Sequence, residues 1–311
     1  MLFSDIYKQL RKYPNSTEIW IYESFFDNGS VEKEKLIVKY KDYNKLEEKI
    51  IQKILDDSTI NVLDDSTIND FRLFYEYNDL GKDTLTTGFY WENNQWVNST
   101  KTEKIYNKKG FLEETIIYNW DGNKWINQIK TQYELEDSGL ISLIKVFSWD
   151  FNNWKLKYQT FYNFLSGNEI EKITIKPHLN DFVYSEKELT KYDDNGNEIE
   201  KSYFEWKDDE WNEKSMEIKN YYDNGLIKEW IIRLSMDDMW VNDAKEEYFY
   251  DDKERLIEWK ASKLEFDEWL VHTRCKYLYN EENEIIQFQT EDFKDNKWVL
   301  TFNGIRKEVI Y

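Results

Sequence analysis

The sequence predicts an all-β protein in which tandem β-hairpin repeats form an antiparallel meander, and this sheet curls or rolls into a solenoid or barrel. Three observations support this class: tryptophan recurs at a fixed spacing, turn-forming residues keep fixed distances from it, and the runs between them alternate apolar and polar residues. The recurring position, here called the slot, is occupied by Trp96, Trp125, Trp154, Phe182, Trp211, Trp240, Trp269 and Trp298. Successive slots are 29 residues apart, except for a step of 28 between Trp154 and Phe182.

Two turns are expected in each repeat. An Asn or Asp stands two residues before every slot, where its side chain can bond to nearby backbone. Gly stands fourteen residues after four slots, while Gly167 comes one place early and Glu254 and Asn283 take the place of Gly in the last two repeats. The first turn predicts a four-residue loop between paired aromatic residues, as in WENNQW at 91–96.

The runs between the turns have the two-residue period of strands. In residues 111–120, Leu112, Ile116, Tyr118 and Trp120 share one parity, whereas polar residues dominate the other. We expect the face that bears the slot tryptophans to point inward.

The odd period restricts the pairing of strands. Side chains alternate between faces, so identical repeats of 29 residues stay in register only if one loop adds a bulged residue. A three-residue loop that ends in a left-handed Gly does so and pairs Tyr106 with Leu112. The same offset predicts the pairs Leu135–Ile141, Phe164–Ile170, Tyr192–Glu198, Tyr221–Ile227, Tyr250–Leu256 and Tyr279–Ile285.

The domain organisation follows from the repeat. Residues 1–16 predict a short amphipathic helix that caps one end, and residues 17–311 predict a single β-hairpin repeat domain. Repeats are regular over 71–311 and irregular over 41–70, where LDDSTIN occurs twice. The N-terminal residues lack the apolar segment of a signal peptide, which indicates a cytoplasmic protein without membrane insertion.

Charge and motif content restrict the function. A net charge of −20 disfavours nucleic acid as a partner. The lone Cys275 and the two histidines, His178 and His272, match no zinc or nucleophile pattern, and phosphate-binding glycine motifs are missing. We therefore expect no enzyme, no cofactor and no metal, and we expect Cys275 and His272 to lie on opposite faces of one strand.

One stripe of apolar residues is a candidate partner surface. It lies on the face opposite the slot tryptophans, which is nominally the outward face, and centres on Trp230, Ile232, Trp259 and Phe288. Rolling of the sheet could bury this stripe; otherwise it marks a surface for a protein partner. The alternative is a carbohydrate-binding module in which several tryptophan rings serve as platforms.

The turn motifs resemble known repeats. The segments YDDNGNEIEK (192–201), YYDNGLIKEW (221–230) and FFDNGSVEKE (25–34) are similar to the YD repeats of rhs-type proteins and to MORN-like Y-Y-x-N-G repeats. The WDGNKWIN turn also resembles Trp-rich hairpin repeats of bacterial surface proteins. The resemblance implies a bacterial or phage interaction protein, a non-catalytic repeat scaffold that mediates protein–protein contacts, with no catalytic residues to carry over.

Overall fold

The computed structural model describes residues 16–42, 45–54, 67–165, 168–179, 181–236 and 239–310. The helix predicted at 1–16 falls on residues that lie outside this part, apart from Ser16, and so does most of the LDDSTIN duplication.

Within the described residues the chain forms twenty strands that all belong to one sheet. Their bounds are β1 (Thr17–Phe25), β2 (Val31–Asp42), β3 (Lys45–Ile54), β4 (Thr67–Tyr77), β5 (Asp83–Glu92), β6 (Gln95–Tyr106), β7 (Leu112–Trp120), β8 (Trp125–Leu135), β9 (Ile141–Asp150), β10 (Asn153–Leu165), β11 (Glu169–His178), β12 (Asp181–Tyr192), β13 (Glu198–Lys207), β14 (Glu210–Tyr221), β15 (Ile227–Met236), β16 (Met239–Tyr250), β17 (Leu256–Glu265), β18 (Glu268–Tyr279), β19 (Ile285–Lys294) and β20 (Lys297–Ile310).

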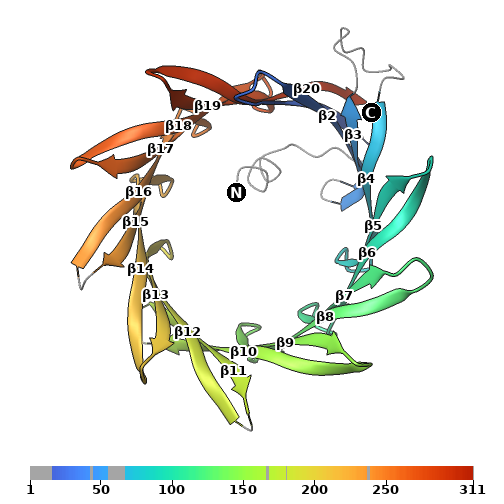
Figure 1. The fold of residues 1–311 in the computed structure, drawn as a ribbon, viewed down its shortest axis with the longest axis vertical. Coiled ribbons are helices and arrows are strands. Elements are labelled where there is room, and N and C mark those ends of the chain that lie inside the picture. Colours follow the sequence, from blue (N-terminus) through green and yellow to red (C-terminus); the bar gives the residue numbers. More distant parts are fainter. Residues whose placement is uncertain are drawn as a thin grey trace.

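The sheet closes into a barrel. Each strand pairs antiparallel with the next one along the chain, and β20 pairs with β1 from Thr17 opposite Ile310 to Ser24 opposite Phe302 (Figure 1). The antiparallel meander is therefore confirmed, and of the curled or rolled forms the chain adopts the closed one. Closure leaves no strand of the sheet with an unpaired edge.

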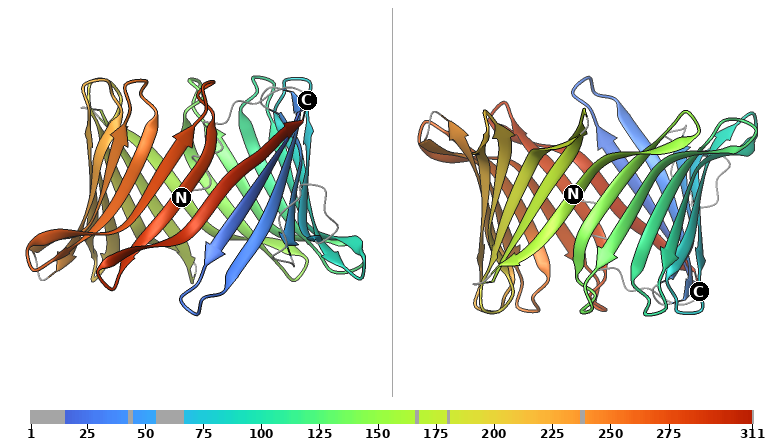
Figure 2. Two further views of the ribbon diagram at one scale, coloured as in Figure 1. Left: turned by 90° about the horizontal axis from the view of Figure 1, so that it is seen from above. Right: turned by 90° about the horizontal axis from the view of Figure 1, so that it is seen from below.

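The two kinds of turn lie at opposite ends of the barrel. The hairpins with the slot tryptophans flare outward at one end, here called the Trp-turn end (Figure 2). The glycine turns form the rim of the other end, which does not flare. The turn between β1 and β2 also lies at the Trp-turn end, because β1 runs in the same direction as β5 and β7.

Most Trp turns are tighter than predicted, whereas the β7–β8 turn has the predicted four-residue loop, residues 121–124, between the paired Trp120 and Trp125. Glu92 pairs with Gln95, so the β5–β6 loop has two residues, Asn93 and Asn94, with φ of 49° and 61°. Two consecutive left-handed residues define the turn that matches the twist of the flanking strands. In the two-residue turns, Asn or Asp before the slot is explained by its tolerance of this backbone. In the four-residue turn the backbone N–H groups of Asn123 and Lys124 instead donate to the side chain of Asp121.

The glycine turn matches the prediction. Tyr106 lies opposite Leu112, and all six other predicted pairs occur. Gly110, with φ of 82°, donates its N–H to the carbonyl of Asn107 at 2.9 Å. The substitutes Glu254 and Asn283 keep the left-handed backbone, with φ of 62° and 66°.

Two further bulges in each regular repeat were not predicted. One falls three residues after the slot, as at Ser99, and the other follows the glycine turn, as at Glu113. Each bulge moves the following side chains to the other face, so two bulges cancel and the parity argument still holds. The β10–β11 pair has no register shift, so this hairpin lacks its second bulge. This missing bulge explains the step of 28 residues from Trp154 to Phe182.

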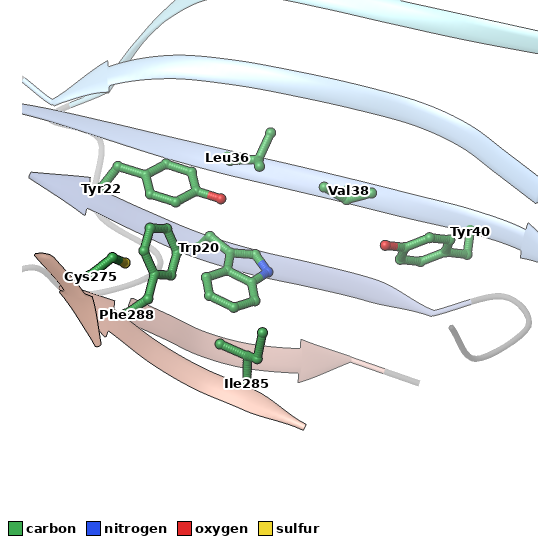
Figure 3. Packing of buried hydrophobic residues seen from close by; sticks show 8 residues of the cluster. All are labelled: Trp20, Tyr22, Leu36, Val38, Tyr40, Cys275, Ile285 and Phe288. Carbon is green, nitrogen blue, oxygen red and sulfur yellow. The ribbon is translucent and has the colours of Figure 1, made fainter. Parts of the chain in front are cut away.

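The slot tryptophans face outward, contrary to the prediction. Figure 3 looks at the wall from the barrel axis, and the side chain of Phe288 on β19 points into the lumen. Phe293 lies five residues further along the same strand, which reverses the face, and it pairs with Trp298. The aromatic pairs of the Trp turns therefore cover the outer face of the wall.

The most deeply buried apolar cluster lies on the lumenal face where the ends of the sheet meet. It combines residues of β1, β2, β18 and β19, among them Trp20, Val38, Cys275 and Phe288, which are at most 2% exposed (Figure 3). This cluster joins the first strands to the last ones and so stabilises the closed form.

Candidate binding surface on the lumenal wall

The stripe predicted from sequence lies in the lumen and not on the outside. Trp259 on β17 is opposite Cys275, whose side chain points toward the axis in Figure 3. Trp230 on β15 is opposite Glu246, which is in turn opposite Ala261, two residues from Trp259. Trp230, Ile232 and Trp259 therefore share the lumenal face with Phe288. Rolling of the sheet has enclosed the stripe within the ring, which corrects its outward assignment.

Phe288 is a packing residue. Its ring is 2% exposed and lies 5.6–6.4 Å, centroid to centroid, from four aromatic rings. Gly304 leaves the space that this ring occupies, because a Cβ at Gly304 would lie 2.4 Å from it. A binding partner cannot reach Phe288 without displacing the cluster.

The remaining stripe residues are only partly buried and adjoin two carboxylates. Glu246 accepts hydrogen bonds from the hydroxyl of Tyr248 and from the indole N–H of Trp259, the latter at 3.0 Å. Glu217, opposite Ile232, accepts one from the hydroxyl of Tyr203 at 2.7 Å. These seven residues are called the lumenal aromatic patch: Tyr203, Glu217, Trp230, Ile232, Glu246, Tyr248 and Trp259.

These carboxylates form no direct ion pair among the described residues. Within the described part of the chain, neither Glu217 nor Glu246 forms an ion pair with Lys or Arg. Two lumenal lysines adjoin the patch, and both form ion pairs with Glu198: Lys201, which lies opposite Glu217, at 3.1 Å and Lys219 at 2.5 Å. The ammonium of Lys219 lies 5.5 Å from the ring of Trp230. Phenol and indole donors stabilise a carboxylate but leave its charge in place.

The phenols of the patch keep their protons. Burial, and then the hydrogen bonds to Glu217 and Glu246, raise the pKa of Tyr203 and of Tyr248 far above the usual value. Neither phenol can act as a general base near neutral pH. The arrangement is suited to binding, because ring faces beside carboxylates that form no direct ion pair attract a cationic group.

A lumenal cavity adjoins the patch. It has a volume of about 430 Å³, includes Tyr203 in its lining, and extends over β10, β11 and β12 past Thr160, Tyr162 and Thr174. Lys172 and Glu188 form an ion pair within it. The cavity thus extends the accessible lumenal wall by three strands.

The outer tryptophans are poor sugar platforms. Trp91–Trp96, Trp120–Trp125 and Trp149–Trp154 meet edge to face, with centroids 4.9–5.1 Å apart and planes at 66–72°. Lysines also cover rings on this face: Lys101 lies 5.6 Å from the ring centroid of Trp125. Stacking on a sugar requires flat, accessible rings, which these pairs do not present.

The two other reactive side chains noted in the sequence, Cys275 and His272, lie in different surroundings. Cys275 is fully buried in the packing cluster, and burial raises the pKa of its thiol. His272 occupies the bulge of β18 and hydrogen-bonds to Thr273. No group of His, Cys, Asp and Glu within the described ranges could hold a metal ion. The expectations of no metal, no cofactor and no catalysis stay predictions.

Comparisons with known proteins give structural matches only. No family model and no curated protein matches the chain. A porin-like protein from Bacteroides uniformis ATCC 8492 is 9% identical, with 94% of this chain and 97% of that one covered and a TM-score of 0.37. A porin-like protein from Bacteroides vulgatus ATCC 8482 is 11% identical, with 76% and 92% covered and a TM-score of 0.27. TcdB2-TccC3-TEV is 10% identical, with 87% and 19% covered and a TM-score of 0.33.

These matches are compatible with an all-β repeat fold and with the YD-repeat resemblance, and they establish no family. The predicted cytoplasmic location is wrong, because the twenty strands close into one antiparallel barrel, the architecture of outer-membrane barrels. That prediction rested on the N-terminal residues alone, whose composition is independent of barrel closure. The described residues form no helix long and apolar enough to cross a membrane.

Proposed function

We propose that the chain is a non-catalytic binding scaffold whose lumenal aromatic patch holds a cationic segment of a partner polypeptide. The observation that carries this proposal is the pair Glu217 and Glu246, which flank Trp230 and Ile232 and accept hydrogen bonds from phenol and indole donors rather than from a paired lysine or arginine. A lysine or arginine side chain of the partner would form the ion pair that these carboxylates lack and stack on an indole ring.

The extent of the patch favours a polypeptide over a small cation. The patch spans β13 to β17, and with neighbouring strands about 4.8 Å apart this is about 19 Å. An extended chain of about six residues covers that distance. The net charge of −20 also attracts a basic partner over a longer range.

The test measures binding of a decalysine peptide by calorimetry, with a serine peptide of equal length and maltohexaose as alternative ligands. The double variant Glu217→Gln/Glu246→Gln should weaken decalysine binding at least about tenfold, because each carboxylate loses its charge. Glu229→Gln is the matched control, since Glu229 lies on β15 next to Trp230 but on the outer face.

The outcomes separate the candidate functions. Equal weakening by Glu229→Gln would show that net charge alone attracts the peptide, and the proposal would fail. Binding of maltohexaose that is lost in Trp230→Ala would instead support the carbohydrate alternative. An unchanged affinity in the double variant would also exclude the lumenal aromatic patch.

A further inference from the structure

Three hairpins at the Trp-turn end carry a large apolar residue at the most exposed point of the turn. Phe151, Leu179 and Phe266 are 91%, 93% and 97% exposed. Each is the first residue of its two-residue turn, the position that Asn93, Asp208 and Asp295 occupy in other hairpins. In these three repeats an apolar side chain therefore stands in water at a position where the other hairpins have a polar one.

The backbone makes this replacement more costly. The φ values of Phe151, Leu179 and Phe266 are 43°, 54° and 50°, in the left-handed region that Asn and Asp tolerate and bulky apolar residues disfavour. Both exposure and backbone conformation therefore oppose these residues in the isolated barrel. Their presence is explained by a contact that the folded chain alone does not make.

All three tips project from one end of the molecule. The hairpins that bear them, β9–β10, β11–β12 and β17–β18, flare away from the axis (Figures 1 and 2). Met236 and Met239, which are 55% and 67% exposed, flank the turn of β15–β16 at the same end. Neighbouring hairpins are about 10 Å apart at the wall, and the flare separates their tips further. The tips therefore form an array of separate apolar points and not a continuous patch.

Tryptophan stands a fixed distance behind two of these tips, in each case as one member of a cross-strand apolar pair. Trp149 and Trp154 lie two residues from the Phe151–Asn152 turn on each strand, and Leu264 and Trp269 hold the same positions behind Phe266. Two residues of a strand correspond to about 7 Å. Apolar points with tryptophan about 7 Å behind them match the layers of a bilayer surface, in which acyl chains take apolar groups and the headgroup region favours Trp.

We infer that the Trp-turn end rests on a lipid bilayer, with Phe151, Leu179 and Phe266 entering the outer acyl layer and the tryptophans at the headgroup level. Only the tips enter, because the outer wall carries ion pairs such as Lys101–Glu103 and Lys145–Glu134 along its strands. Three carboxylates adjoin the tips: Asp150, Asp181 and Asp267. Because they would be repelled by anionic headgroups, the lipid surface that we infer is zwitterionic.

The test is flotation of the full chain with phosphatidylcholine vesicles at low and high salt. The wild-type protein should float at both, because apolar insertion is insensitive to screening. The variant Phe151→Asn/Leu179→Asn/Phe266→Asn should lose at least about tenfold in partitioning. It is expected to fold at least as well as wild type, because Asn suits the left-handed backbone.

The matched control is Leu80→Asn/Leu140→Asn, which removes two exposed leucines at the glycine-turn end and should leave flotation unchanged. A wild-type protein that does not float, or a triple variant that floats like wild type, would overturn the inference. Tip-dependent dimers in sedimentation velocity, without vesicle binding, would identify a second copy of the chain as the occupant instead.

Discussion

Deleting single residues of β19 tests how side chains are assigned to the two faces of the wall. Ile286 is the bulged residue after the last glycine turn, whereas Gln289 is a regularly paired residue three positions later. Without Ile286 the hairpin becomes equivalent to β10–β11, which lacks this bulge and keeps its register. Every later side chain of β19 then stays on its face.

Deletion of Gln289 has a different consequence. The least disruptive accommodation removes the bulge at Ile286, turns Phe288 outward and places Gln287 in the lumenal cluster. Exposing a phenylalanine that is 2% exposed costs about 3 kcal/mol, and burying an amide without partners costs about 1–3 kcal/mol. The expected loss is therefore about 4–6 kcal/mol, compared with about 1 kcal/mol for deletion of Ile286.

Urea unfolding followed by far-ultraviolet circular dichroism measures both losses against wild type. The deletion of Ile286 should keep the slope of the transition and move the midpoint slightly, whereas the deletion of Gln289 should lower the midpoint strongly or leave the protein insoluble. Equal losses in the two variants would refute the reasoning, because they would show that the bulged residue is as necessary as a paired one.

Two further predictions concern turns and buried phenols. Glu254→Gly should raise the free energy of unfolding by about 1 kcal/mol, because Glu254 has a φ of 62°, which glycine adopts without strain. Gly225→Ala should lower it by a similar amount through backbone strain alone, because φ is +80° and an added Cβ meets nothing within 4 Å. Thermal melts with the opposite order would contradict this prediction. Burial raises the pKa of Tyr250 and of Tyr279 to about 12, so the folded state holds these protons more tightly than the unfolded chain. The stability that these two phenols contribute is complete below pH of about 10 and is lost as the pH rises through 12. Absorbance at 295 nm should therefore show that they ionise later than free tyrosine. Ionisation of both phenols near pH 10 in the native protein would contradict the prediction.

The pairing of strands could be predicted because it depends on local rules. Parity and turn type alone place Tyr106 opposite Leu112, and they require a left-handed backbone at Glu254 and Asn283. The bulges could not be predicted, because no special residue marks them: Ser99 and Glu113 are ordinary strand residues. Since two bulges cancel in parity, the period reveals only the one that is missing.

The face that points inward could not be predicted either. Both faces carry large aromatic residues, such as Trp125 outside and Trp230 inside, so apolar content does not determine the direction of curvature. Closure depends on twist and stagger summed over all strands, which no single repeat encodes. The candidate site was therefore assigned to the wrong side, although Trp230 and Trp259 do share a face as predicted.

Counting from the slot also fails beyond the missing bulge. Ile173 and Ile175 have the same offset from their slot as Trp230 and Ile232, so counting residues alone would place them on the same face. In the structure Ile173 is opposite Lys187, whose ammonium lies 5.3 Å from the ring centroid of the outer Trp211. The apolar stripe is thus interrupted at β11, and the lumenal aromatic patch begins only at β13.

Departures from the repeat are not distributed evenly around the ring. The lumenal positions that Trp230 and Ile232 occupy on β15 are occupied on β7 by Thr115 and Ile117, which pair with the neighbouring strands on both sides. Strand pairing at these positions therefore does not require a large aromatic ring. Among the described turns of the Trp-turn end, the apolar residues that are more than 90% exposed lie on hairpins between β9 and β18, whereas β5–β6 keeps Asn93. Hairpins such as β5–β6, which keep polar turn residues, show which residues the fold itself requires. Residues that exceed this requirement, at a cost in exposure or backbone conformation, gather on the side of the barrel from β9 to β18, where we propose both the lumenal binding surface and the lipid contact.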